Sequence, residues 1–246
     1  MTTGTGTALI VVDMQNDFCA GPVAGSRYRG DPARLAIVTA NVVRAVDVAR
    51  RHGTQVVFVR FLGDVAYQGA SWRQRDRALG KRPKCLDGSW GAAFHQVAPA
   101  PGEMVFTKRA CFDAFLSDGF EPALTQLGVE RLVFAGLYTD VCVDSTARTA
   151  FQKGYHVTVL TDCTASLHLP DEEILRFMRL VYGAHVTTHD RPESWSGPAS
   201  GEDMWSARHT ATPERTDGTT RRTNAARTSP ETDAARASRR ASGSPP

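Results

Sequence analysis

The chain has few cysteines and no long apolar stretch. Its five cysteines are an odd number and none forms a CxxC pair, so neither a disulfide framework nor a Cys-rich metal site is indicated. No apolar run approaches the roughly 20 residues that a transmembrane helix needs. The first residues, MTTGTGTALIVVD, lack the charged start and long apolar core of a signal peptide. We therefore predict a protein of a reducing compartment, most simply the cytoplasm, that does not contact membranes.

Large aliphatic residues are absent from the C-terminal part of the chain. From Thr187 onward there is no Leu, Ile, Val or Phe, and beyond Ser196 only Met204 and Trp205 are large and apolar. Such a segment cannot bury enough apolar surface to offset its ordering entropy. We expect one folded domain over residues 1–195 and a disordered tail rich in Arg, Ala, Thr and Ser over residues 196–246.

The predicted tail carries charges of both signs. Eight arginines lie among six acidic residues, and no aromatic side chain separates the arginines. A basic tail can contact nucleic acid. The mixed charges favour a solvated appendage instead, with no nucleic acid as partner.

Apolar runs alternate with segments of helical spacing over the rest of the chain. Strands are predicted at 8–12, 55–61, 103–108, 131–135, 155–160 and 185–187, and helices at 32–52, 122–127, 141–153 and 171–182. This order indicates an α/β fold, a doubly wound, Rossmann-like parallel sheet of about six strands with helices on both faces. Residues 62–102 fit neither pattern and are expected to be a long ordered loop that forms a lid or an interface.

Three reactive side chains are expected at the carboxyl ends of strands, where open α/β sheets bind ligands. Asp13 follows the first strand, Lys108 ends the third, and Cys142 lies just past the fourth, near the start of a helix. Each alone has an ordinary structural role: a loop cap, a snorkelling surface lysine or a small core residue. Asp17, a little further along MQNDF, is the better candidate for holding a loop.

Together these three side chains favour covalent catalysis. A helix N-terminus would stabilise a Cys142 thiolate, and a desolvated Asp13 would have a pKa high enough to accept the thiol proton. The sulfur would attack a carbonyl carbon and form an acyl-enzyme. Backbone amides of the turn over residues 136–142 would form the oxyanion hole.

Three stretches resemble the isochorismatase-like cysteine hydrolase family, and in particular its N-carbamoylsarcosine and ureidoacrylate amidohydrolase branch. They are ALIVVDMQNDFC, VFTKRACFDAF and GLYTDVCVDSTARTAFQKGYHVTVLTDCTAS. The resemblance implies a catalytic triad on Asp13, Lys108 and Cys142. It also implies a cis peptide bond between Leu137 and Tyr138, an oxyanion hole from the amides of Tyr138 and Cys142, and a homodimer or homotetramer.

The chain departs from the family's pattern at three places. Phe112 lies four residues after Lys108 and not three, so Arg109 is the alternative for the lysine position; we prefer Lys108, which follows the strand directly. Tyr138 stands where the family usually has a small residue, and its ring is expected to narrow the pocket. The histidines expected of nicotinamidases are missing from FVRFLGDVAYQG. We therefore expect no metal, no cofactor and a substrate other than nicotinamide.

The leading hypothesis is a cysteine-dependent amidohydrolase. It would cleave a non-peptide C–N bond of a small amide, carbamoyl or ureido compound through a thioester. The alternatives are an isochorismatase-type vinyl ether hydrolase with Asp13 as the acid, and a non-enzymatic scaffold whose tail contacts nucleic acid. Further candidates for substrate binding are Phe18, Arg60, Trp90, Phe112 and Tyr138.

Overall fold

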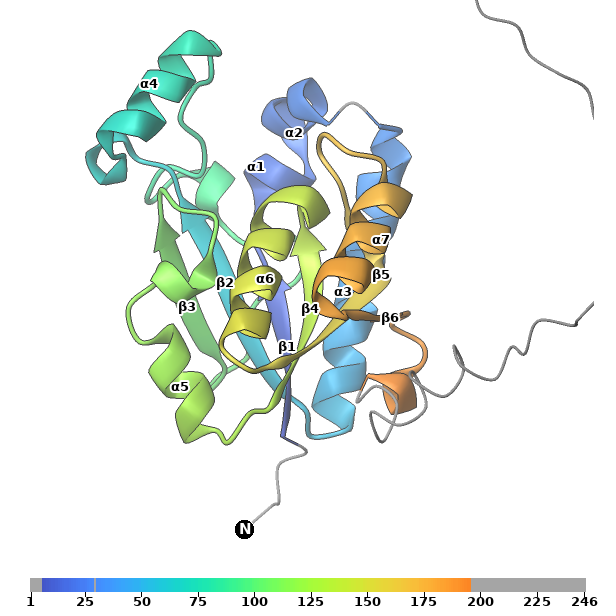
Figure 1. The fold of residues 1–246 in the computed structure, drawn as a ribbon. Coiled ribbons are helices and arrows are strands. Elements are labelled where there is room, and N and C mark those ends of the chain that lie inside the picture. The colour runs from blue at the N-terminus through green and yellow to red at the C-terminus, as the bar shows by residue number, and fades with distance from the viewer. Residues whose placement is uncertain (1–5, 29, 196–246) are drawn as a thin grey trace, which may run out of the picture. The chain divides into compact units, whose positions relative to one another are not determined.

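A six-stranded sheet forms the centre of the part that the computed structural model describes, residues 6–28 and 30–195. The predicted tail lies outside the described residues. All neighbouring strands are parallel, in the order β3-β2-β1-β4-β5-β6 (Figure 1). The prediction of a doubly wound parallel sheet is confirmed. The strands are β1 (Thr7–Val12), β2 (Gln55–Leu62), β3 (Met104–Arg109), β4 (Arg131–Leu137), β5 (His156–Ala165) and β6 (His185–Thr187).

Helices cover both faces of the sheet because the central strands are apolar on both sides. Along β1, Leu9 and Val11 pack in the core that includes α3, whereas Ile10 and Val12 pack in the core beneath α5, α6 and α7 (Figure 1). No helix in the described part is long and apolar enough to cross a membrane. The helices that cover the two faces of the sheet are α3 (Pro32–Arg51), α5 (Phe120–Gln126), α6 (Asp144–Gln152) and α7 (Asp171–Tyr182).

The predicted irregular segment contains a helix that its sequence does not reveal. The nine residues of α4 (Ala70–Ala78), ASWRQRDRA, have no apolar stripe. Trp72 anchors this helix, since its indole stacks on Phe61 and lies 4.7 Å, ring centre to ring centre, from Phe112. The same segment holds the short helices η1 (Val65–Tyr67) and η2 (Trp90–Ala92), and η3 (Ala114–Leu116) and η5 (Pro192–Ser194) follow later.

Short helices gather at the end of the sheet where its strands terminate. There α1 (Asn16–Cys19) and α2 (Gly21–Arg27) follow β1, and α4 follows β2 (Figure 1). Open α/β sheets bind ligands at this end, beside the strands where the winding direction changes. In this sheet those strands are β1 and β4.

A glycine lets β1 and β4 approach each other at that point. Gly136 pairs with Val12 in the parallel register and adopts φ +117°. A Cβ atom on this residue would lie 2.0 Å from the Val12 carbonyl oxygen. Any side chain at position 136 would therefore push the two strands apart, next to Asp13.

Candidate active site

Asp13 and Lys108 form a fully buried ion pair at the carboxyl end of the sheet. Asp13 leaves β1 at φ +52°, in the left-handed region that few non-glycine residues occupy. The Lys108 Nζ on β3 donates to the Asp13 Oδ2 at 2.6 Å and to the Phe112 carbonyl oxygen at 3.1 Å. Both side chains are 0% exposed. Two charges are therefore held in apolar surroundings by direct contact with each other.

The structure places Lys108, and not Arg109, beside Asp13. Neighbouring residues of a strand face opposite sides of the sheet, and Arg109 is exposed, with its guanidinium carbon 5.5 Å from the centre of the Tyr67 ring. Ala110 adopts φ +48° directly after β3. The chain turns there, and the Phe112 carbonyl lies against the Lys108 ammonium.

Cys142 lies in the first turn of the helical segment that follows β4. This segment opens as one π-helical turn, η4 (Thr139–Val143), and continues as α6. The peptide bond between Leu137 and Tyr138, just before the turn, is cis. The thiol is buried, and the charges of Asp13 and Lys108 both act on it. Within the described chain no nitrogen or oxygen donor occupies the Asp13 Oδ1, so this oxygen can accept the thiol proton.

Burial and charge shift the pKa values of this cluster. Removal from water raises the pKa of Asp13, and the Lys108 charge opposes the rise only in part. Burial alone would lower the pKa of Lys108, but Asp13 and Cys142 outweigh it, and that pKa is raised. Burial and the Asp13 charge also raise the pKa of the Cys142 thiol. Both effects oppose the thiolate that the helix N-terminus was expected to stabilise.

The thiol opens on a small cavity with aromatic walls. Its volume is about 50 Å³, and Phe18, Phe112 and Tyr138 are among its lining residues. The Tyr138 hydroxyl donates to the Phe18 carbonyl oxygen at 2.8 Å, and the two rings meet edge to face. The Tyr138 ring is thus a fixed wall that narrows the cavity.

A protein-family model, the isochorismatase domain, matches residues 7–191, three quarters of the chain. The chain belongs to the isochorismatase family. It is 32% identical over 172 residues to a ureidoacrylate amidohydrolase of Stutzerimonas stutzeri, covering 64% of this chain and 69% of the relative. The corresponding enzyme of Pantoea ananatis is 33% identical, with 64% and 68% covered.

Solved structures of this family share the fold. The N-carbamoylsarcosine amidase from Thermoplasma acidophilum is 26% identical with a TM-score of 0.63, over 75% of this chain and 96% of that chain. The nicotinamidase from Bacillus subtilis has the same identity and TM-score, over 74% and 99%. These named relatives are amidohydrolases, which confirms the predicted enzyme class, a hydrolase of C–N bonds in small amides.

The structure does not bring Arg60 and Trp90 to the cavity of this isochorismatase-family protein, and their role in substrate binding stays a prediction. Arg60 and Phe61 are neighbours on β2, so their side chains lie on opposite faces of the sheet. The Arg60 Nε donates to the Thr107 Oγ1. Trp90 is 60% exposed in η2, and its ring packs against Gly21. A position close in sequence to the site did not predict a place in the cavity. The alternation of side chains along β2 directs Arg60 away from the cavity, and the short helix η2 does the same for Trp90.

Two polar residues after Asp13 hold the loops around the site. The Gln15 amide bonds to both backbone groups of Phe61 and to the Ala92 carbonyl oxygen. The Asp17 Oδ2 accepts from the Cys85 amide at 2.6 Å, which confirms Asp17 as a loop-holding residue. Gln15 was not predicted, since no pattern in the sequence marks a partner that lies 46 residues away.

A possible metal-ligand set lies elsewhere in the described chain. Asp162, Cys163 and His189 bring three ligand atoms within 4.8 Å of one another. Asp162 is already hydrogen-bonded to the His189 ring, and none of the three lines the cavity at Cys142. This set is therefore separate from the Asp13, Lys108 and Cys142 cluster.

Proposed function

We propose that this protein hydrolyses a small amide, carbamoyl or ureido compound with Cys142 as nucleophile and Asp13 as proton carrier. The observation that carries the proposal is the buried Asp13–Lys108 pair beside the Cys142 thiol, where β1 and β4 end. The chemistry needs no metal, because the ammonium of Lys108 supplies the fixed positive charge.

In the first step the Asp13 Oδ1 takes the thiol proton while the sulfur attacks the carbonyl carbon. The electron pair of the C=O double bond moves to its oxygen, which accepts hydrogen bonds from the backbone amides of Tyr138 and Cys142. One proton has moved and Lys108 stays charged. The raised pKa of Asp13 suits it to this transfer.

In the second step Asp13 gives its proton to the leaving nitrogen. The C–N bond breaks, its electron pair goes to nitrogen, and a thioester on Cys142 remains. A water molecule then transfers a proton to Asp13 as its oxygen attacks the thioester. The sulfur leaves and recovers the proton, which releases a carboxylic or carbamic acid and regenerates the thiol.

Ammonia release from a panel of ureido, carbamoyl and carboxamide compounds identifies the substrate. During turnover, acid-quenched protein should carry an acyl adduct on the peptide that contains Cys142, detectable by mass spectrometry. Cys142→Ala should lose the adduct and the activity, whereas Cys163→Ala, a buried cysteine outside the cavity, should keep both. Full ammonia release by Cys142→Ala would exclude the covalent mechanism.

The setting of the enzyme is part of the proposal. The five cysteines are free thiols, which supports a reducing compartment such as the cytoplasm. Residues 1–195 would act as the hydrolase domain and 196–246 as an appendage.

The exposed apolar side chains of α7, Phe177, Leu180 and Val181, support a homodimer or homotetramer. Light scattering after size exclusion tests the assembly, and a monomeric mass at micromolar concentration would contradict it.

A further inference from the structure

The space around Cys142 is lined by cations without matching carboxylates. Arg27, Arg75, Lys81 and Lys84 line the inner cavity, and none of the described lining residues is Asp or Glu. A wider cavity of about 650 Å³ adjoins it and adds Arg82, again with no acidic residue among its described lining. The chain as a whole is nearly balanced, with 29 Lys and Arg against 26 Asp and Glu. The positive charge is therefore a local feature of this site.

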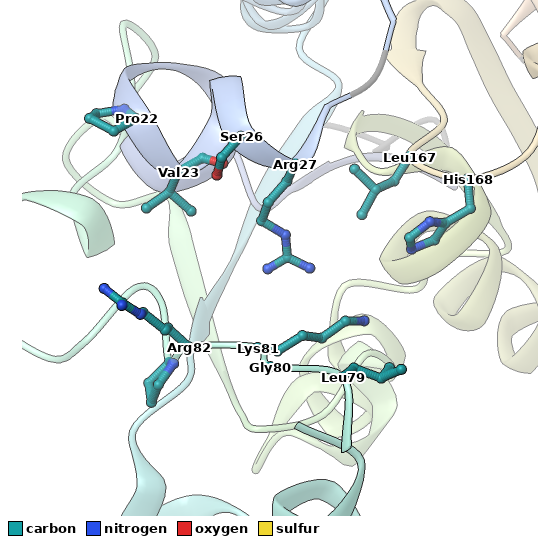
Figure 2. A pocket seen from close by; sticks show the side chains of 11 residues that line it. Pro22, Val23, Ser26, Arg27, Leu79, Gly80, Lys81, Arg82, Leu167 and His168 are labelled. Atoms are coloured by element: carbon teal, nitrogen blue, oxygen red, sulfur yellow. The ribbon is translucent and has the colours of Figure 1, made fainter. Parts of the chain in front are cut away.

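The cations come from two separate segments that face each other. Arg27 projects from the last turn of α2, and Lys81 and Arg82 come from the segment after α4 on the opposite side (Figure 2). The inner and wider cavities share Arg27 and Lys81. A ligand that passes from the wider cavity to Cys142 thus moves between positive side chains on both sides, which favours anions.

Only one of these five cations forms an ion pair within the described ranges. Arg75 pairs with Asp76 at 2.6 Å and lies over the Trp72 ring, so its charge is already matched. Lys84 and Arg27 form no ion pair with any residue in the described ranges. Unpaired cations in the cavity of the nucleophile leave room for a negative charge from the ligand.

Lys84 is held inside the site. Its Nζ lies 5.6 Å from the centre of the Phe61 ring and 6.0 Å from that of Phe18. The next residue, Cys85, adopts φ +48° and donates its amide to the Asp17 carboxylate. The backbone at this point is therefore fixed, and the ammonium is placed before any ligand arrives.

The charged surroundings of Lys84 also favour an incoming anion. Desolvation, followed by the Arg27 charge, lowers its pKa to about 8. An anion bound here would relieve both effects, because it pairs with the two cations and replaces their lost hydration. The titratable groups that face Lys84 are Arg27, Asp76, Cys85, Cys142 and Asp13.

We propose that Lys84 and Arg27 bind a carboxylate of the substrate, so that this enzyme acts on amides or ureido compounds that carry a carboxylate near the scissile carbonyl. This inference rests on the function proposed above. The aromatic rings of Phe18 and Phe112 would pack on the atoms between the two groups. Lys81 and Arg82 at the wider cavity would draw the anion inward.

Matched probes test the proposal. 3-Ureidopropionate and 3-ureidopropanol differ only in the terminal group, as do succinamate and 4-hydroxybutanamide. The wild-type enzyme should favour the carboxylate of each pair by roughly ten- to a hundredfold in kcat/KM, the usual worth of a hydrogen bond to a charged group. Lys84→Met should remove this preference by raising KM for the carboxylates alone, and Lys84→Arg should keep most of it.

A surface lysine provides the control. Lys153 pairs with Glu121 at 2.7 Å on α5, and Lys153→Met should leave the preference unchanged. Thermal unfolding verifies that each variant is folded. A preference that survives in Lys84→Met would overturn the assignment to Lys84, and equal rates for both members of each pair in the wild type would overturn the anionic substrate.

Binding to Cys142→Ala separates this inference from the proposed reaction. Isothermal titration calorimetry with the same probes needs no turnover. Tighter binding of the carboxylates, lost when Lys84→Met is added, would support the carboxylate site even if no probe is hydrolysed. Equal affinities within each pair, or no binding by any probe, would overturn it and leave the amidohydrolase proposal to the ammonia-release screen.

Discussion

Replacing Asp13 by Asn should reduce stability as well as activity. The substitution keeps the size of the side chain but leaves the Lys108 ammonium, 0% exposed, without its counter-charge. The Phe112 carbonyl oxygen at 3.1 Å is a dipole and cannot replace a carboxylate. Removing one partner of a buried ion pair costs about 3–5 kcal/mol. In a domain of this size that loss lowers Tm by about 6–20 °C, because each kcal/mol shifts it by about 2–4 °C.

The double variant Asp13→Asn/Lys108→Met should recover most of the lost stability but no activity, because no uncompensated charge remains. Lys108→Met alone should be destabilised less in mild acid than at neutral pH. Burial raises the pKa of Asp13, and without Lys108 the largest effect that opposes this rise is lost. For a group whose folded pKa is raised, the stability present below the unfolded pKa is lost as pH rises through the folded value.

Urea unfolding at neutral pH, followed by tryptophan fluorescence, measures these differences. Asp47→Asn is the matched control, because Asp47 is half exposed and lies 4.0 Å from Arg50; its loss should stay below about 1 kcal/mol. The buried ion pair does not stabilise the fold if Asp13→Asn loses no more free energy of unfolding than Asp47→Asn. A double variant no more stable than Asp13→Asn would show that the uncompensated charge of Lys108 is not the cause of the loss.

Three further predictions concern the thiol, the carboxylate site and the strand contact. The Cys142 thiol should be uncharged at neutral pH because burial raises its pKa. The measurement is the difference in thiolate absorbance between wild type and Cys142→Ala as a function of pH, and a step in this difference near neutral pH would contradict the prediction. The preference for carboxylate probes, as a ratio of kcat/KM values, should be constant below pH 8 and fall above it as Lys84, with its pKa of about 8, loses its charge; a flat ratio on the alkaline side would argue against Lys84. Gly136→Ala should lower the free energy of unfolding by more than about 4 kcal/mol, because its Cβ would meet the Val12 carbonyl oxygen. Gly154→Ala, at positive φ in open space, should lower it by about 1–3 kcal/mol. Equal losses of stability in thermal unfolding would refute the contact between the strands at Gly136.

The fold was predictable because its strands are local and strongly apolar. The run ALIVV and the segment before Gly136 are buried on both faces, and continuous apolar runs are typical of parallel strands. The helix α4 was not predictable in the same way. Its stability depends on Trp72 packing against Phe61 and Phe112, which lie in other elements, and no periodicity records such contacts.

The placement of the reactive groups followed from one topological rule, since Asp13, Lys108 and Cys142 all end or follow strands. The carboxylate site had no such rule. Lys84 lies in a segment without a repeating pattern, and it is fixed through the contact between Asp17 and Cys85, 68 residues apart. A basic run such as KRPK is usually a solvated surface, and only tertiary contacts turn one of its lysines inward.

The charges of the site divide into two sets with separate tasks. The carboxylate of Asp13 and the ammonium of Lys108 cancel, and the attack of the sulfur moves one proton within this set, so the buried charge changes place but not amount. An anionic substrate would add one uncompensated negative charge to an apolar site, which is costly unless a cation meets it. Lys84 is the cation in position to do so. If Lys84 took part in the chemistry instead, its replacement would lower kcat for neutral and anionic probes alike, whereas a binding role raises KM for the carboxylates alone.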